Sequence, residues 1–167
     1  QANTDQSLGR GDFVQSDAIS WYGRFSWAKD REYQPAAFQG LGTWTNSRPD
    51  QALVGNTWVV SPSIVNTARF GWSRFDNTIV GTHSYTEDIN GELLQISGLN
   101  LSGNSAFWGL PNFGITGYTG FGDRANIYLT HNNIWEVTND LSWVLGKHVM
   151  KMGFTSKRIN YNQLGNQ

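Results

Sequence analysis

Apolar and polar side chains alternate along several stretches of this chain. In one stretch Trp21, Gly23, Phe25 and Trp27 share a face, and the positions between them are filled by Tyr22, Arg24 and Ser26. A period of two residues is typical of a β-strand whose two faces meet different surroundings. The same alternation predicts six strands, of roughly 8 to 12 residues each, centred on residues 8–13, 20–27, 52–60, 67–73, 135–143 and 150–157. The stretch 52–60 has apolar residues on both faces, so its register is ambiguous.

The predicted connections are of two kinds that alternate along the chain. Short turns are expected at residues 14–17, 61–63 and 145–147, and long loops at about 29–50 and 77–132. In an antiparallel meander this order puts every tight turn at one end of the sheet and every long loop at the other. Short periplasmic turns and long extracellular loops are typical of an outer-membrane β-barrel. We therefore predict an all-β fold, an antiparallel segment of a transmembrane barrel.

The two faces of the predicted strands differ in chemistry. Trp residues lie near the strand ends of the apolar face, for example Trp21 and Trp143 beside short turns and Trp27 and Trp72 toward the long loops. Trp and Tyr concentrate where hydrocarbon meets head groups. The opposite face carries mixed charges, which suit a watery lumen because a basic residue on the lipid face would cost ~2–4 kcal/mol. The charged residues expected to face the lumen include Arg24, Arg69, Glu136, Asp140 and Lys151, with Arg10, Asp12 and Lys157 on the same side.

Composition is consistent with this interpretation. Charged residues make up 15%, the net charge is -1 and the mean hydropathy is -0.45, so the chain lacks the basic character of a nucleic-acid-binding protein. A strand in lipid needs only every second residue apolar, which keeps the mean hydropathy low. The chain has no cysteine. It begins without Met and stops after a strand pattern, so we expect an internal piece of a longer protein.

A sheet of six strands is too narrow to close into a barrel, and open sheet edges are not tolerated in lipid. We therefore expect the chain to belong to a larger closed sheet. A soluble β-sandwich is the alternative, although a loop of this length fits such a fold poorly.

The second long loop is rich in glycine and aromatic residues. Residues 88–92 contain Asn-Gly, which predicts a local hairpin with a type I′ turn. Farther along, Trp108, Phe113, Tyr118 and Phe121 offer flat surfaces that could contact an extracellular ligand. Packing of the loop against its neighbours is the alternative role for the same four residues.

Four groups of residues, in the same order along the chain, resemble Oar-like TonB-dependent transporters, which are receptors with a carboxypeptidase-like regulatory domain. They are residues 8–26, with LGRGD and YGRFS around a turn; residues 60–74, VSPSIVNTARFGWSR; residues 109–123, with GLP, ITGY and GD; and residues 139–153, with NDLSWVLGKH and KMG.

The resemblance implies a 22-stranded barrel in the outer membrane of a Gram-negative cell, filled by a plug domain. It implies uptake of a scarce solute with energy from TonB–ExbB–ExbD, and no catalysis. The partners expected are membrane lipid and lipopolysaccharide, the plug and TonB machinery through regions outside this chain, and the imported solute. Residues 1–167 would be part of the barrel domain.

Residues for catalysis, metal binding or a cofactor do not form a recognisable pattern. His83, His131 and His148 are scattered, and the acidic residues near Asp88 lack the order of a calcium loop. Asp140 and Glu136 could suit acid–base chemistry, but pairing with basic residues on adjoining strands is the expected use. Residues 100–102 fit the N-glycosylation acceptor pattern, which is short enough to occur by chance. A passive porin and a soluble carbohydrate-binding β-protein remain the functional alternatives.

Overall fold

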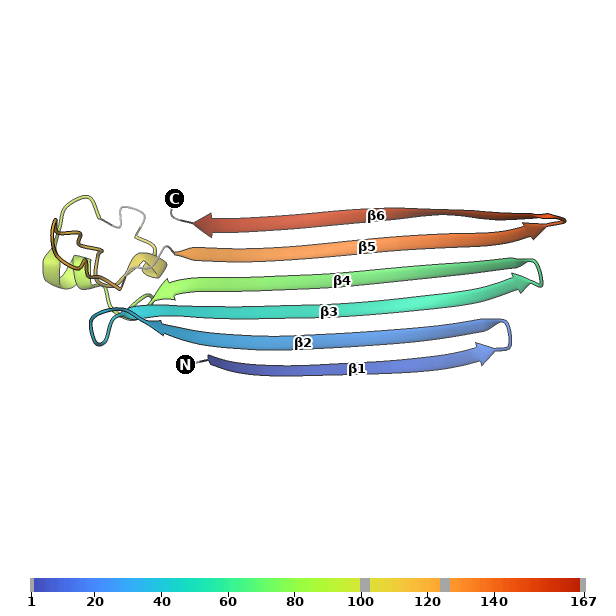
Figure 1. Ribbon diagram of the computed structural model, residues 1–167, viewed down its shortest axis with the longest axis horizontal. Coiled ribbons are helices and arrows are strands. Elements are labelled where there is room, and N and C mark those ends of the chain that lie inside the picture. Colours follow the sequence, from blue (N-terminus) through green and yellow to red (C-terminus); the bar gives the residue numbers. More distant parts are fainter. Residues whose placement is uncertain (1, 100–102, 124–126, 166–167) are drawn as a thin grey trace.

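The computed structural model describes residues 2–99, 103–123 and 127–165. They form one antiparallel sheet in which each strand pairs with the next along the chain (Figure 1). The strands are β1 (Ala2–Ser16), β2 (Ile19–Pro35), β3 (Gly42–Ser61), β4 (Ile64–Gly81), β5 (Tyr128–Leu145) and β6 (His148–Gly165). The six predicted strands and their order are thus confirmed.

The connections separate by length, as predicted (Figure 1). Tight turns at residues 17–18, 62–63 and 146–147 lie at one end of the sheet, and loops 36–41 and 82–127 lie at the other. Gly146 has a φ of 59°, a left-handed conformation that glycine adopts without steric cost. At the second turn, the Ser61 hydroxyl accepts a hydrogen bond from the Ser63 backbone N–H at 3.3 Å.

The strands are longer than the sequence pattern predicted. They run for 15 to 20 residues rather than 8 to 12. The apolar alternation, from Ile19 to Trp27 on β2 and from Trp135 to Trp143 on β5, covers only the part nearer the short turns. Beyond that part the strands remain paired, but their outward positions become polar. The hydrophobic pattern therefore marked the apolar part of each strand and missed its extension.

The prediction of a long loop over residues 29–50 is wrong for the same reason. β2 continues to Pro35 and β3 begins at Gly42, which leaves only residues 36–41 as a loop. Cross-strand contacts hold this polar extension together: the Tyr33 and Trp44 ring centroids are 4.8 Å apart, and the Arg31 guanidinium lies 4.1 Å from the Trp44 centroid. Aromatic and cation–π pairs of this kind stabilise strands that lack apolar alternation.

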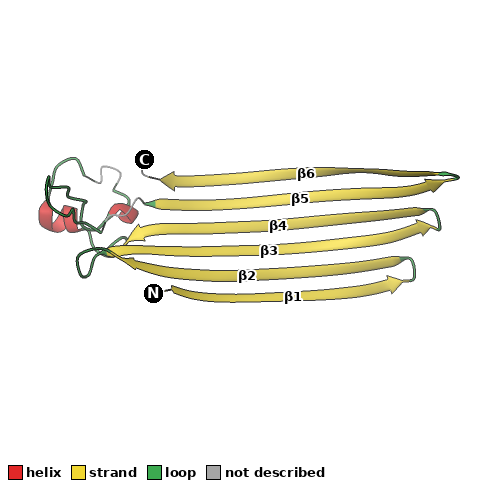
Figure 2. Ribbon diagram, viewed as in Figure 1, coloured by secondary structure: helices red, strands yellow, loops and turns green. Residues whose placement is uncertain are grey.

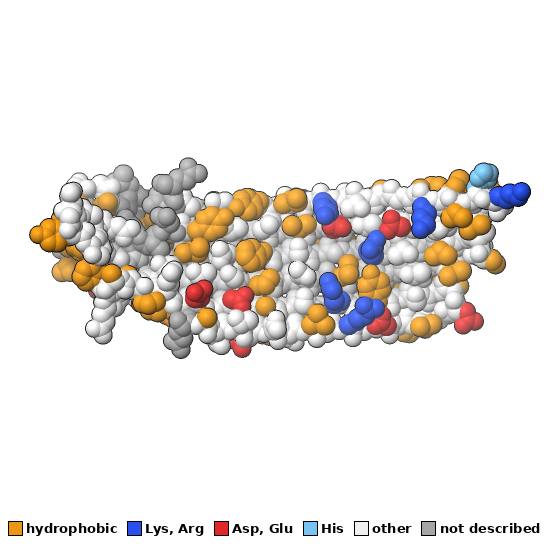
Figure 3. Space-filling model, viewed as in Figure 1, with side chains coloured by type: hydrophobic (Ala, Val, Ile, Leu, Met, Phe, Trp, Pro, Cys, Tyr) orange, Lys and Arg blue, Asp and Glu red, His pale blue; other side chains and the backbone are white. Residues whose placement is uncertain are grey.

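Cross-strand pairing assigns each residue to a face. Phe70 lies between Val54 and Val137 on the apolar face, whereas Arg69 lies between Gly55 and Thr138 on the other. The ambiguous strand is resolved in this way, with Val54 on the apolar face. Figure 3 views the charged face, where basic side chains gather over the middle of the sheet and the part nearer the short turns, while acidic side chains lie both among them and toward the long loops.

The sheet is a single layer. Both faces are open over most of their length in the described part of the chain, and apolar residues such as Phe25 and Phe70 remain 49% and 47% exposed. A soluble β-sandwich would bury these side chains under a second sheet. The buried hydrophobic residues instead form a small cluster at the long-loop end, where Val80, Ala106 and Ile127 pack with Trp44, Phe107 and Leu129.

Helical structure is confined to the long loop (Figure 2). The predicted type I′ hairpin at residues 88–92 is wrong, because Ile89–Leu94 form one turn of π-helix. The Asp88 carboxylate accepts a hydrogen bond from Gly91 N–H at 3.0 Å, and this cap competes with the hairpin geometry. A short 3₁₀ turn spans Ser105–Phe107. No helix in the described residues is long and apolar enough to span a membrane.

Candidate functional site

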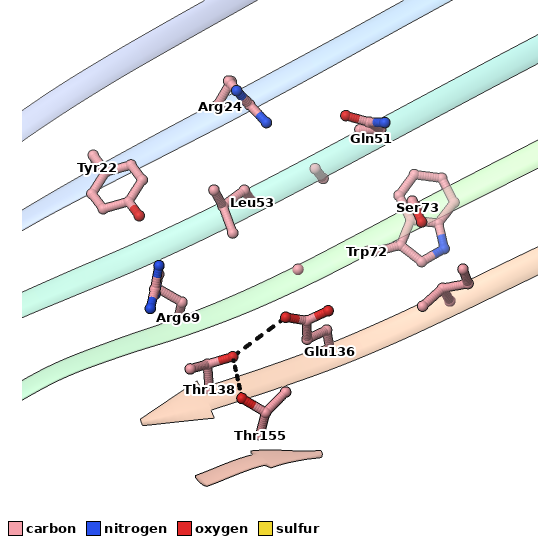
Figure 4. Close-up of a pocket in the computed structure, with 13 residues that line it drawn as sticks. Tyr22, Arg24, Gln51, Leu53, Arg69, Trp72, Ser73, Glu136, Thr138 and Thr155 are labelled. Atoms are coloured by element: carbon pink, nitrogen blue, oxygen red, sulfur yellow. Dashed lines mark hydrogen bonds between the residues drawn. The ribbon is translucent and has the colours of Figure 1, made fainter. Parts of the chain in front are cut away.

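The middle of the charged face contains a shallow depression that opens to solvent (Figure 4). Arg24 on β2, Arg69 on β4 and Glu136 on β5 project around it, and Leu53 lies between them (Figure 4). These residues come from successive strands at nearly the same level, because antiparallel pairing places alternate residues of each strand side by side. Three of the five charged residues expected to face a lumen are therefore brought together here.

A glycine makes room for the Tyr22 ring, which lines this depression. A Cβ on Gly55 would lie 2.2 Å from the Tyr22 ring, so only glycine lets that ring lie flat across β3. The Tyr22 ring also faces the Arg10 guanidinium, whose carbon lies 5.1 Å from the ring centroid. The depression is thus lined by a ring and guanidinium groups, which can contact both apolar and anionic parts of a solute.

Ion pairs join neighbouring strands across this face. Arg69 contacts Asp140 at 2.8 Å from β4 to β5, and Lys157 contacts Glu136 at 2.8 Å from β6 to β5. Both carboxylates are therefore engaged by basic residues on adjoining strands, as expected from the sequence. All four side chains are substantially exposed, so each pair contributes little to stability, with a median of ~0–1 kcal/mol for such pairs.

Two of the predicted charged residues are available for other contacts. Arg24 and Lys151 lie on the same face as Arg69 and Asp140, and neither has an ionic partner among the described residues. Lys151 lies beside Asp140 around a second hollow nearer the short turns. Free basic groups beside ion pairs form a polar surface suited to hydrated solutes.

A buried carboxylate organises the long loop. The Asp123 side chain is fully buried, and it accepts hydrogen bonds from the backbone N–H of His83 at 2.9 Å and of Leu110 at 2.5 Å. The His83 ring also contacts this carboxylate through Nδ1. These contacts join three distant segments of the loop. The sequence analysis missed this role, and a buried acid cannot be identified from spacing alone.

The four aromatic residues proposed as solute contacts differ in how far their rings are covered. Phe113 and Phe121 stack on each other with centroids 5.0 Å apart, and Phe38 from the short loop packs on Phe121 at 5.9 Å. Trp108 is partly buried, whereas Tyr118 is 79% exposed. Tyr118 therefore has the most ring surface open to a solute. Phe38 joins the group from a part of the chain that the sequence analysis did not connect with it.

Among the described residues, no group of three or more His, Cys, Asp and Glu side chains could hold a metal ion. His131 contacts Asp76, and His83 contacts Asp123 and lies 3.9 Å from Glu87. The glycosylation pattern at residues 100–102 lies outside the described residues.

The fold and its two faces define a segment of a membrane β-barrel: a single-layer antiparallel meander with one apolar aromatic face, one charged face and connections sorted by length. The sequence as a whole matches the protein family described as outer membrane beta barrel domain, over residues 1–167. The chain belongs to this family, and its location is the cell outer membrane. No curated protein and no solved structure matches the chain. Family membership argues against the soluble carbohydrate-binding interpretation.

Proposed function

We propose that this chain supplies three adjacent hairpins of the barrel of a TonB-dependent transporter, which imports a scarce solute with energy from TonB–ExbB–ExbD. In this proposal residues 1–167 are part of a barrel domain of about 22 strands, as in the Oar-like transporters that the sequence resembles. The plug domain and the TonB-binding segment belong to other parts of the protein. Transport, without a catalytic step or a bound cofactor, is the proposed activity.

One observation carries the membrane part of the proposal. A band of about nine residues with mostly apolar outward positions crosses three strands: Ile19 to Trp27 on β2, Ile64 to Trp72 on β4 and Trp135 to Trp143 on β5. Its polar members Asn66 and Asn139 hydrogen-bond to each other through their side chains. A transmembrane strand tilted by ~45° needs about 9–11 residues. Lipid would meet this band, and the charged face behind it would line the lumen. The long loops would then face outward and the short turns the periplasm.

The transporter part of the proposal rests on the four ordered groups of residues that resemble the Oar-like family. The loops add support, because Asp123 accepts hydrogen bonds from His83 and Leu110 and so joins separate segments of the Gly-rich loop at the outward end of the sheet. A loop held in this way can present an aromatic ring to a solute. We propose Tyr118 as a solute contact, with Trp108, Phe113 and Phe121 supporting its position.

The competing function is a passive porin, and energy dependence separates the two. The full-length protein would be expressed in cells with and without TonB, and uptake of labelled peptides, glycans and chelated iron would be measured. The transporter proposal predicts that uptake of the recognised probe is lost without TonB. Equal uptake in both strains, with passive flux of the same probe into liposomes containing the purified protein, would instead identify a porin.

Direct contact with TonB gives a second test that needs no known solute. Site-specific cross-linking in the full-length protein should join the segment before the plug to the periplasmic domain of TonB. Deletion of that segment is the matched control. Absence of any cross-link at every position tested would argue against the transporter.

A further inference from the structure

The apolar face changes character along the strands in three zones. Nearest the short turns is the apolar band, which ends at Trp27, Trp72 and Trp135. Farthest from them, Val80 and Trp44 lie on the same face, covered by the long loop in the small buried cluster. Charged side chains occupy the zone between the two. This intermediate zone meets neither hydrocarbon nor the loop core.

Four basic residues of this zone form what we call the basic rim: Lys29 on β2, Arg48 on β3, Arg74 on β4 and Arg158 on β6. Pairing of Arg74 with Asp50 and of Arg158 with Trp135 puts both on the face that holds Phe70. The β2–β3 register joins Trp27 to Asp50 and Asp30 to Ser47, which sets Lys29 beside Arg48. Each rim residue therefore lies on the apolar face, at the loop-side end of the apolar band.

The rim runs obliquely across the strands, as the edge of a membrane would. The level of each rim residue along the strands follows from its pairing partner. Arg48 lies at the level of Asp76 on β4, and Arg74 lies one outward position nearer the short turns on the same strand. Arg74 pairs with Asn133 on β5, and Arg158 pairs with Trp135, which is one further outward position toward the short turns. Barrel strands tilt by ~35–45°, so a fixed height shifts by about one residue per strand at a spacing of ~4.8 Å. The rim shifts by about four residues over the four steps from β2 to β6, which matches a constant depth.

Three acidic residues neighbour the rim: Asp5 is exposed and pairs across the strands with Lys29, whereas Asp50 and Asp76 contact Arg48 and Arg74. The Asp50 side chain is 7% exposed, whereas that of its partner Arg48 is 65% exposed. Arg48 contacts Asp50 through Nε at 3.1 Å, and Arg74 contacts Asp76 through Nε at 2.8 Å. Within the described chain, these ionic contacts leave the terminal Nη groups of both arginines for another anion. Lys29 and Arg158 have no ionic partner among the described residues.

A hollow at the junction of the apolar band and the rim has both chemistries on its walls. Its volume is ≈ 610 Å³, and Phe25 and Trp27 line it on the membrane side. On the loop side it is lined by Lys29 and Arg48 together with Asp50 and Asp76, the carboxylates that the rim arginines contact. An amphipathic molecule fits this arrangement, with hydrocarbon against the rings and an anion against the basic groups. Guanidinium groups bind phosphate oxygens in pairs, which gives them a geometric preference for phosphate.

We infer that the basic rim binds the phosphate groups of lipopolysaccharide in the outer leaflet, with acyl chains against Phe25 and Trp27. The inference rests on the proposed orientation, in which the long loops face outward. Charge complementarity, constant depth and the amphipathic hollow all favour a phosphorylated membrane lipid over a protein partner. Each basic residue near an anionic lipid surface contributes about a fivefold change in binding.

Removal of Lys29 and Arg158 tests the inference without breaking an ion pair. The full-length protein and its Lys29→Gln/Arg158→Gln variant would be purified from outer membranes in mild detergent, and bound lipopolysaccharide would be counted by native mass spectrometry. Nanodiscs of phosphatidylcholine with phosphorylated or dephosphorylated lipid A would then give the increase in Tm. We expect the variant to bind phosphorylated lipid A about 25-fold more weakly and to lose most of the Tm increase.

Three controls make the result specific. Lys147→Gln removes the same charge at a short turn on the opposite membrane side and should bind as the unaltered protein does. Lys29→Arg keeps the charge and should retain binding. Heat-modified migration in SDS gels reports whether the protein forms a barrel, so failure of the unaltered protein to do so would contradict the proposed function rather than the rim. The inference would be overturned if Lys29→Gln/Arg158→Gln and Lys147→Gln bound phosphorylated lipid A equally well. It would also be overturned if the unaltered protein bound dephosphorylated lipid A as tightly as phosphorylated lipid A, or if a protein co-purified at the rim instead of the lipid.

Discussion

Phe70 and Ser73 are close in sequence and lie on opposite faces of β4. Phe70 is 47% exposed on the apolar face beside Trp135, with ring centroids 5.8 Å apart, whereas Ser73 lines the depression on the charged face. Because arginine at the bilayer midplane costs ~2–4 kcal/mol on a lipid-facing position, Phe70→Arg should block insertion of the full-length protein. Ser73→Arg should be tolerated. The amount of heat-modifiable protein in outer-membrane fractions measures both, and equal yields would contradict the assignment of the faces.

Asp123 offers a second residue-scale prediction, this time in the loop. Asp123→Ala would leave the partly buried N–H groups of His83 and Leu110 without their acceptor, at a cost of up to ~1–3 kcal/mol for each unsatisfied group. We expect the loop to open while the strands remain paired. Limited proteolysis of intact cells should then cleave loop 82–127 faster, with no change in heat-modified migration. Asp88→Ala, at the exposed cap of the π-helix, is the comparison and should have a smaller effect.

Strands were predictable from the sequence only where their two faces differ in polarity. The alternation around Phe25 or Leu141 comes from contact with two different solvents, so it located six strands and their faces. Beyond Trp27 both faces of β2 are polar, and the cross-strand contact of Arg31 with Trp44 leaves no period in the sequence. The buried Asp123 and the contact of Phe38 with Phe121 also depend on segments that are far apart along the chain.

Close approach of β5 and β6 gives an element-scale prediction. A Cβ on Gly153 would lie 2.6 Å from the Asn139 backbone oxygen, and backbone cannot move away as a side chain can. Gly153→Ala should therefore push β6 from β5 and lower the yield of assembled barrel. Gly71→Ala on the same face is the matched control, because its Cβ would meet only Leu53 at an ordinary 3.6 Å. Comparable melting temperatures of the two assembled variants would show that β6 accommodates the methyl group.

At the scale of the whole molecule, the sheet depends on surroundings that these residues do not supply. The apolar face exposes large side chains such as Phe154 at 60% and Met152 at 52%, and β1 and β6 each pair on one side only within the described chain. Unpaired edges beside an exposed apolar face promote association between chains. Residues 1–167 expressed alone should therefore aggregate without detergent and show no heat-modified band. Size-exclusion chromatography and circular dichroism give the measurement, and a monodisperse, folded monomer in plain buffer would contradict the barrel interpretation.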